Sequence, residues 1–461
     1  MELTKEEKQY RRMIETPVKR LVLTLAVPTT ISMLITSIYN IADTMFVSHL
    51  SVAASGGVGV AYPIMAIIQA FGFMFGMGAS SNISAKLGRK QVEEAKSIGA
   101  TAFYSALAVG LLITIIGLLF LNPIINVLGA TEGVFPHAAS YARYILMGAP
   151  IMAASFVLNN ILRGEGKAKF AMIGIVTGAI LNIGLDPLFI YTFNLGTAGA
   201  AIATIISQLV SFSILISFFI SKKAIMSLNP KYIAKKGGTY LEIIKVGLPS
   251  LARQGLASLA TILLNNQAAI YGSDAALSAM GIVSKVYMVV FAMVLGIGQG
   301  YQPVCGYNYS AEHYERVKEA CVFTYLTSVI AMALACCILF IFSRQVMQIF
   351  IQDEDTINIG IYALRFRCIA LPLIAMNVID NMTFQAIRKK FLALFLSCLN
   401  QGLFFIPLVF ILPYFFGING VELVQAGADV LTFLVSIPFF IYIIKHLNAK
   451  MKSKTLKLAK D

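Results

Sequence analysis

An aspartate followed by a proline lies in the middle of an apolar stretch. The segment "LNIGLDPLFIY" places Asp186 and Pro187 within residues 170–193, an apolar run long enough to cross a bilayer. A charged aspartate inside a membrane costs roughly 2.5 to 3.5 kcal/mol, so it is rarely kept without a partner or a role. Asn182 precedes Asp186 by one helical turn, and the ring of Pro187 leaves a backbone carbonyl without its hydrogen bond. The segment predicts a cage of carboxylate, amide and carbonyl oxygens for a proton or a small cation.

Asp43 is a second acidic residue inside an apolar run, in the segment "SIYNIADTMFV". Thr36, Asn40 and Asp43 follow the i, i+4, i+7 spacing of one helix face. Two carboxylates in a cavity poor in water do not readily carry their charges together, so we expect one of them to take up a proton. The alternative interpretation is that each acid makes only a structural hydrogen bond to a hydroxyl group.

These acids require elements that span a membrane. The 461-residue chain is 58% hydrophobic and 13% charged, and its mean hydropathy is +0.79. This composition predicts an all-α polytopic membrane protein, with twelve transmembrane helices of about 20 residues or more. The apolar runs cover residues 21–47, 57–83, 98–121, 139–162, 170–193, 198–220, 241–270, 276–304, 320–342, 359–384, 391–416 and 420–444.

The chain also resembles itself at a constant offset, which relates "AVPTTISML" at Pro28 to "GLPSLARQG" at Pro249. Six helices separate the copies, an even number, so the halves form a parallel repeat. We predict an N-terminal six-helix lobe at 1–221, a cytoplasmic linker at 222–240 and a C-terminal six-helix lobe with a basic tail at 241–461. Two such pseudo-symmetric lobes around a central cleft suit a transporter with alternating access. The alternative is a duplication that only built a stable bundle, as in some channels or membrane enzymes.

The basic residues are distributed in alternate breaks between the apolar runs. The formal net charge is +14, and most of the 36 lysines and arginines lie in the N-terminus, every second break and the C-terminal tail. This pattern predicts cytoplasmic termini and a lipid bilayer, not nucleic acid, as the partner. The sequence contains neither a GxxxxGK[ST] loop nor a metal-ligand spacing. We therefore expect no cofactor and an ion gradient, of H⁺ or Na⁺, as the source of energy.

Further polar residues lie inside the apolar runs of the second half. Arg253 and Gln254 occur in "LARQGLAS", and Asp380 corresponds to Asn159 at the offset of the repeat. We interpret Arg253, Gln254 and Asp380 as a candidate second polar site, with a structural contact as the alternative. Arg253 and Lys285 could neutralise Asp380 or Asp429, or could line the cleft.

With the duplicated lobes, Asp43, "LNIGLDPLFIY" and "LRGEGKAKF", the sequence resembles the MATE (multidrug and toxic compound extrusion) transporters over nearly its whole length. It is most similar to their prokaryotic DinF-like and MepA-like branch. The resemblance implies a transporter rather than an enzyme. It further implies antiport of lipophilic, often cationic compounds against H⁺ or Na⁺ across a bacterial plasma (inner) membrane, by a functional monomer.

The resemblance also implies the site residues at matching positions. For cation coupling they are Asp43, Asp186, Asn182 and Thr204, and for the substrate cavity they are Tyr141 and Asn159. The helix spacing around Asp43 and the proline beside Asp186 add Asn40, Thr36 and Pro187 to the candidate cavity residues. Another branch of the family uses acids on the seventh and tenth helices. Here the seventh helix carries Arg253 and Gln254, and only Asp380 on the tenth is acidic. Two alternatives stay open, a flippase of lipid-linked precursors from the same superfamily and a membrane protein that transports nothing.

Overall fold

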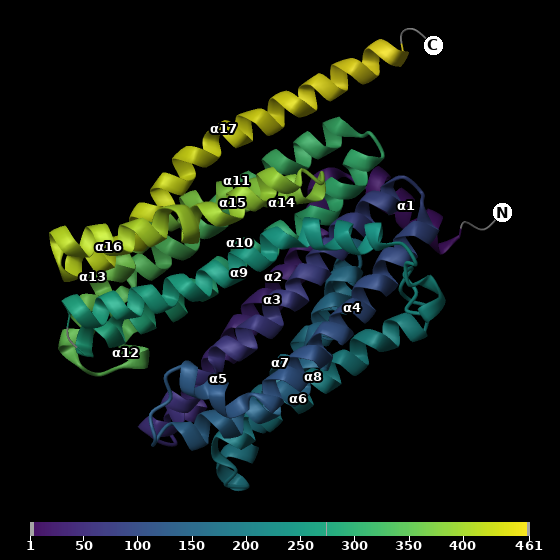
Figure 1. Cartoon of the computed structure of the whole chain (residues 1–461). Coiled ribbons are helices and arrows are strands. Elements are labelled where there is room, and N and C mark those ends of the chain that lie inside the picture. The colour runs from purple at the N-terminus through teal and green to yellow at the C-terminus, as the bar shows by residue number, and fades with distance from the viewer. Residues whose placement is uncertain (1–3, 273, 459–461) are drawn as a thin grey trace. The chain divides into compact units, whose positions relative to one another are not determined.

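A computed structural model of the protein describes residues 4–272 and 274–458, in which every regular element is a helix (Figure 1). The predicted all-α fold is confirmed. The first half contains α1 (Lys5–Glu15), α2 (Val18–Ser48), α3 (Val52–Gly88), α4 (Val92–Leu119), α5 (Leu121–Val127), α6 (Phe135–Gly164), α7 (Ala168–Pro187), η1 (Leu188–Thr192) and α8 (Gly196–Ile220). The second half contains η2 (Pro230–Tyr232), α9 (Gly237–Tyr271), α10 (Asp274–Ser310), α11 (Tyr314–Ile341), α12 (Ser343–Phe350), α13 (Glu354–Ala370), η3 (Leu371–Leu373), α14 (Ile374–Ala386), α15 (Lys390–Cys398), η4 (Leu399–Phe404), α16 (Phe405–Phe416) and α17 (Ile418–Leu458).

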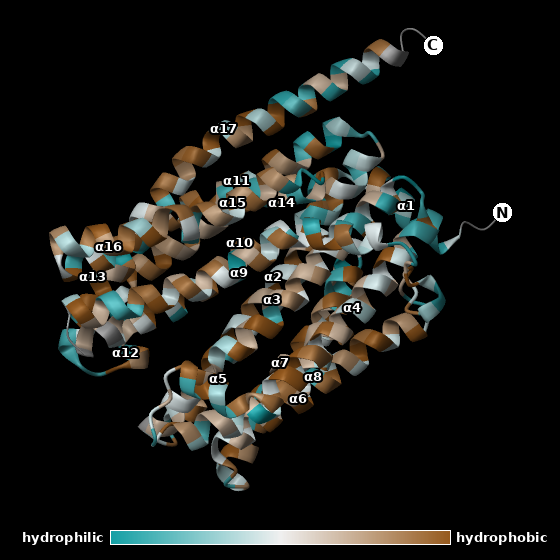
Figure 2. Ribbon diagram, viewed as in Figure 1, coloured by the Kyte–Doolittle hydropathy of each residue, from teal (hydrophilic) through white to brown (hydrophobic). Residues whose placement is uncertain are grey.

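Eleven helical segments of the described chain are long and apolar enough to cross a membrane. Each coincides with a predicted run, and the remaining run, 241–270, lies in α9, which Lys245, Arg253 and Gln254 make more polar. Apolar residues cover most of α4, α8 and α16, whereas α1 is largely hydrophilic (Figure 2). Large apolar side chains on the helix surfaces, such as Phe391 at 87% exposure, are suited to contact with lipid.

The chain divides into two compact units, which differ from the predicted lobes. Unit 1 consists of the chain up to Arg12 together with Ile31–Leu251, and unit 2 consists of Met13–Thr30 together with the chain from Ala252 onward. The first part of α2 therefore belongs with the C-terminal half, and the linker and the first part of α9 belong with the N-terminal half. Three cuts fall inside helices, and one of them, before Met13, lies in α1. The other two, before Ile31 and before Ala252, are separated by the same offset as Pro28 and Pro249, so they fall at equivalent positions of the repeat.

Glycines allow the first parts of α2 and α9 to pack closely within the units to which they belong. In unit 1, a Cβ atom on Gly247 of α9 would lie 1.9 Å from the carbonyl oxygen of Met74 on α3. In unit 2, a Cβ atom on Gly300 of α10 would lie 2.3 Å from the Cα of Ala26 on α2. Both distances are far inside van der Waals contact, so only glycine permits these backbone approaches.

The predicted linker is held to unit 1 by a buried carboxylate in the loop between α6 and α7. Glu165 is fully buried, and it accepts hydrogen bonds from the backbone N–H groups of Ile225 at 2.8 Å and Met226 at 2.9 Å. Lys167 lies 3.4 Å from the same carboxylate. Burial raises the pKa of the Glu165 carboxyl, against the opposing effects of Lys167 and the two N–H donors. The start of the linker is thus fixed by hydrogen bonds rather than only by chain connectivity.

Candidate cation-binding site in unit 1

The local structure around Asp186 departs from a regular α-helix. Helix α7 ends at Pro187 and continues as the π-helical segment η1. A proline cannot donate a backbone hydrogen bond, and π-helical turns often occur at functional sites. Asp186 and Asn182 lie on the last turns before this irregularity, with exposures of 0% and 2%. Both polar side chains therefore point into the protein.

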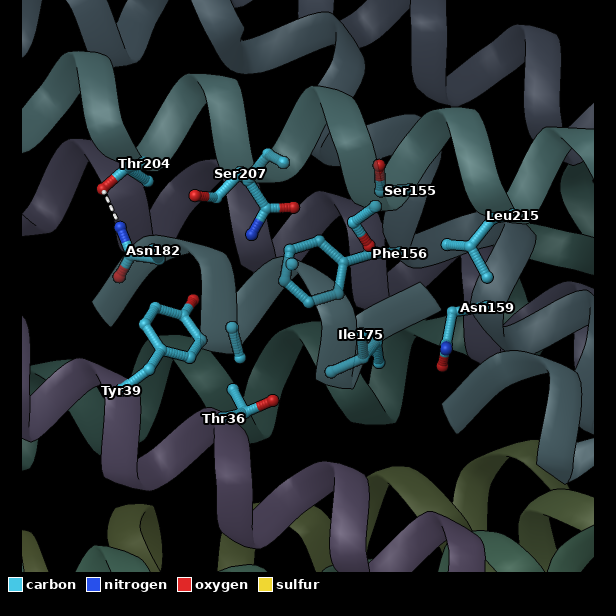
Figure 3. A pocket seen from close by; sticks show the side chains of 14 residues that line it. Thr36, Tyr39, Ser155, Phe156, Asn159, Ile175, Asn182, Thr204, Ser207 and Leu215 are labelled. Carbon is cyan, nitrogen blue, oxygen red and sulfur yellow. Dashed lines mark hydrogen bonds between the residues drawn. The ribbon is translucent and has the colours of Figure 1, made fainter. Parts of the chain in front are cut away.

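Asn182 connects Asp186 to helix α8. Its Nδ2 donates to Asp186 Oδ1 at 3.2 Å and to Thr204 Oγ1 at 3.5 Å, the latter drawn in Figure 3. Thr204 Oγ1 in turn donates to the carbonyl of Ala200 at 3.0 Å. Asp186 Oδ2 and Asn182 Oδ1 are buried and have no hydrogen-bond partner among the described residues. Two unsatisfied acceptor oxygens at one place favour a proton or a cation as the missing partner.

Asp43 on α2 belongs to the same electrostatic cluster. Its charge interacts with that of Asp186, and both acids interact with the phenol groups of Tyr39 and Tyr141. Asp43 Oδ1 is likewise buried without a hydrogen-bond partner in the described part of the chain. The structure thus brings together the two acids that the sequence singled out, although they lie on helices far apart in the chain.

A small cavity lies beside this cluster (Figure 3). Its volume open to water is about 40 Å³, whereas pockets for drug-sized ligands measure roughly 300 to 1,000 Å³. The space suits a small cation with a few water molecules. Its polar lining includes Thr36, Tyr39, Asn159, Asn182, Thr204 and Gln208.

The other predicted cavity residues have different environments. Thr36 lines the cavity and its hydroxyl donates to the carbonyl of Ser32 at 2.8 Å. Asn159 also lines the cavity, while its amide donates to the carbonyl of Ala171 at 2.9 Å and so ties α6 to α7. Asn40 is half-buried and is not part of the lining.

Tyr141 is 2% exposed, and its hydroxyl contacts the sulfur of Met65 at 3.9 Å. Tyr141 therefore interacts electrostatically with Asp43 and Asp186, but it does not line the cavity.

The MatE family model matches the chain twice, over residues 28–188 and 249–411. The chain belongs to the MatE family. The two matches start at Pro28 and Pro249, the positions that define the predicted repeat, and so agree with it. The resemblance to MATE transporters of the MepA-like branch is confirmed, and as a MATE protein the chain is a multi-pass membrane transporter and not an enzyme.

Relatives of this MATE protein have names that describe export. "Multidrug export protein MepA" of Staphylococcus aureus is 27% identical over 409 residues, covering 88% of this chain and 90% of that protein. Its namesake from Staphylococcus saprophyticus is 26% identical and covers 86% and 87% of the two chains. A solved structure described as the outward-facing conformation of a multidrug resistance MATE family transporter superposes with a TM-score of 0.91 at 26% identity, covering 98% of this chain and 100% of that chain.

The candidate second site of this MATE protein is not assembled as a group of paired charges. Asp380 on α14 is fully buried, and neither carboxylate oxygen has a hydrogen-bond partner among the described residues. Arg253 and Gln254 on α9 are half-buried. The ion pairs of the described chain do not join Arg253 or Lys285 to Asp380 or Asp429. The predicted neutralisation by Arg253 or Lys285 is therefore not found in the structure.

Several polar residues of the unit 1 cavity were missed by the sequence analysis, among them Tyr39 and Gln208. Tyr39 and Gln208 both line the cavity, and their side chains interact with each other. Tyr39 follows Thr36 by three positions and Gln208 follows Thr204 by four. This spacing on the helix faces of known candidates could have identified both residues.

Proposed function

We propose that this MATE transporter is a cation-coupled multidrug exporter, which exchanges lipophilic, often cationic compounds for H⁺ or Na⁺ by alternating access. The observation that carries the proposal is the set of buried, unpartnered oxygens of Asp186, Asn182 and Asp43 in unit 1. The names of the MepA relatives support multidrug compounds as the cargo. The positive-inside bias supports a bacterial plasma membrane orientation with both termini in the cytoplasm, and we place the transporter there as a monomer.

In this proposal, drug export is coupled to cation entry because the drug and the cation compete for the same carboxylates. The outward-facing protein takes a cation at Asp43 and Asp186, which rearranges α2 and weakens drug binding, so the drug leaves outward. Release of the cation on the inside restores the carboxylates and resets the protein. A ligand shifts a conformational equilibrium only by its differential affinity for the two states, and drug and cation compete for the same charge.

Efflux of a fluorescent lipophilic cation from proteoliposomes tests the proposal, with a pH gradient and a Na⁺ gradient imposed separately. We expect one gradient to drive wild-type efflux, and Asp43→Asn and Asp186→Asn each to abolish it. Glu132→Gln serves as a matched control, because Glu132 is an exposed acid in a loop of the same unit. Full gradient-driven efflux by both correctly folded variants would contradict the assignment of the site.

Absence of wild-type transport under either gradient would overturn the export function itself. Scrambling of a labelled anionic lipid by the same vesicles would then favour the flippase.

A further inference from the structure

Unit 2 contains a second buried acid with its own hydrogen-bond network. Asp429 lies in α17 and is fully buried. Its Oδ1 accepts hydrogen bonds from Asn400 Nδ2 at 2.8 Å and from Gln425 Nε2 at 2.9 Å. Gln425 Nε2 also donates to Asn400 Oδ1 at 3.2 Å. The second carboxylate oxygen, Asp429 Oδ2, is buried and has no hydrogen-bond partner among the described residues.

Asp429 is part of a polar stripe along one face of α17. The stripe follows the spacing i, i+3, i+7, i+10, i+14, and none of its members is more than 7% exposed. It consists of Glu422, Gln425, Asp429, Thr432 and Ser436. Asn400 Nδ2 reaches Thr432 Oγ1 at 3.2 Å, and Asn377 Nδ2 of α14 reaches Ser436 Oγ at 3.3 Å. Amide and hydroxyl groups therefore continue in both directions along the helix from the buried carboxylate.

One buried cation faces Asp429 without pairing with it directly. Arg367 of α13 interacts electrostatically with Asp429, but its guanidinium carbon lies 3.7 Å from the ring centroid of Tyr287 on α10. Arg367 Nε and Nη1 are buried and lack hydrogen-bond partners among the described residues. The ion pairs of the described chain do not include one between Arg367 and Asp429. The thiol of Cys336 on α11 is a further titratable group that interacts with Asp429.

The repeat shows why this acid differs from those of unit 1. At the offset that relates Pro28 to Pro249, Asp429 corresponds to Gln208, which lines the unit 1 cavity. The position of Asp43 corresponds to Leu264, which has no charge. Asp186 corresponds to the apolar Ile406 or Pro407. Unit 2 therefore carries its acid at the position equivalent to a cavity-lining glutamine, and not at the positions equivalent to Asp43 and Asp186.

We propose that Asp429 is a second proton-binding site of the transporter, located in unit 2, with Arg367 as its internal counter-ion. A proton on Oδ2 neutralises the carboxyl and leaves Arg367 stacked on Tyr287. Loss of the proton creates a negative charge that attracts Arg367 toward Asp429. The positive charge of Arg367 disfavours a metal cation here, and the described residues contain no group of three or more His, Cys, Asp or Glu able to hold one. This site goes beyond the proposed coupling in unit 1.

Infrared difference spectroscopy of the purified full-length protein, recorded across a pH titration, tests the inference through the band of the protonated carboxyl group. The parent is the Asp43→Asn/Asp186→Asn variant, so that a failure of the unit 1 site cannot be confused with a failure of this one. We expect Asp429→Asn to remove one pH-dependent carboxyl component, while Glu132→Gln removes none of the buried components. An unchanged titration in Asp429→Asn would overturn the proposal.

Arg367→Met tests the counter-ion and retains the carboxyl group if Asp429→Asn fails to fold. Loss of a nearby positive charge favours the neutral acid, so we expect the midpoint of the Asp429 component to move up by about one to three pH units. An unchanged midpoint of the Asp429 component would show that Arg367 does not stabilise the charged form of Asp429. It would overturn the proposed pair.

Discussion

Asn182 determines how Asp186 is presented to a bound ion. Its amide occupies one carboxylate oxygen and also reaches Thr204, whereas the other oxygen is left without a partner among the described residues. A hydrogen bond to a charged carboxylate stabilises the charged form. The side chain of Asn182 therefore favours release of the cation or proton, which the transport cycle requires as much as its binding.

Asn182→Ala should consequently make Asp186 retain its proton to higher pH. Loss of a hydrogen bond to a charged group costs about 1.5 to 3 kcal/mol, which corresponds to a shift of roughly one to two pH units. We expect the pH for half-maximal efflux to rise by that amount in proteoliposomes driven by a pH gradient. Asn126→Ala, at an exposed position in α5, is the control. Identical pH profiles for wild type and Asn182→Ala would contradict this role.

Helix packing in unit 1 depends on two backbones that approach each other without side chains between them. Gly247 of α9 faces the carbonyl of Met74, and Gly78 of α3 faces the carbonyl of Ile243, where a Cβ would lie 2.1 Å away. These contacts hold the first part of α9 on α3. They explain why the unit boundary falls inside α9 and not in the preceding linker.

Gly247→Ala should destabilise the protein, because the added methyl group meets a backbone atom that cannot turn away. Overpacking of this kind typically costs about 1 to 3 kcal/mol, so we expect a clear fall in the thermal transition of the detergent-solubilised protein. Gly255→Ala in the same helix is a matched control, since a Cβ there meets nothing within 4 Å. Equal thermal transitions for the two variants would show that the close approach is not important for stability.

Besides the short helix α1, two long helices belong to both compact units of the molecule. The units meet within α2 at Ile31 and within α9 at Ala252, and Pro28 and Pro249 lie inside these helices just before the cuts. A proline inside a helix removes a backbone hydrogen bond and favours a kink. Each proline therefore lies close to the point where its helix passes from one unit to the other, at a position that favours bending of the helix.

Pro249→Ala should slow transport several-fold while leaving folding intact, because alanine restores the hydrogen bond and stiffens α9. Initial efflux rates and the thermal transition, measured on the same preparation, separate the two effects. Pro438→Ala is the control, since Pro438 lies in α17 within unit 2. A wild-type rate in Pro249→Ala would indicate that bending near this proline does not limit transport.

The sequence by itself determined the features that depend on local pattern. Apolar runs of membrane-spanning length identified the helices, and the constant offset between matching segments identified the duplication, because both properties are written in consecutive residues. The pairing of Asn182 with Asp186 followed in the same way from the spacing of one helical turn.

Only the tertiary structure decided which distant segments pack together. It assigned the first parts of α2 and α9 to the opposite halves of the chain. It also placed Gln208 beside Tyr39 and put Arg367, rather than Arg253 or Lys285, within electrostatic reach of Asp429. These neighbours come from different helices, and the periodicity of one helix specifies which face is polar but not which other helix that face meets.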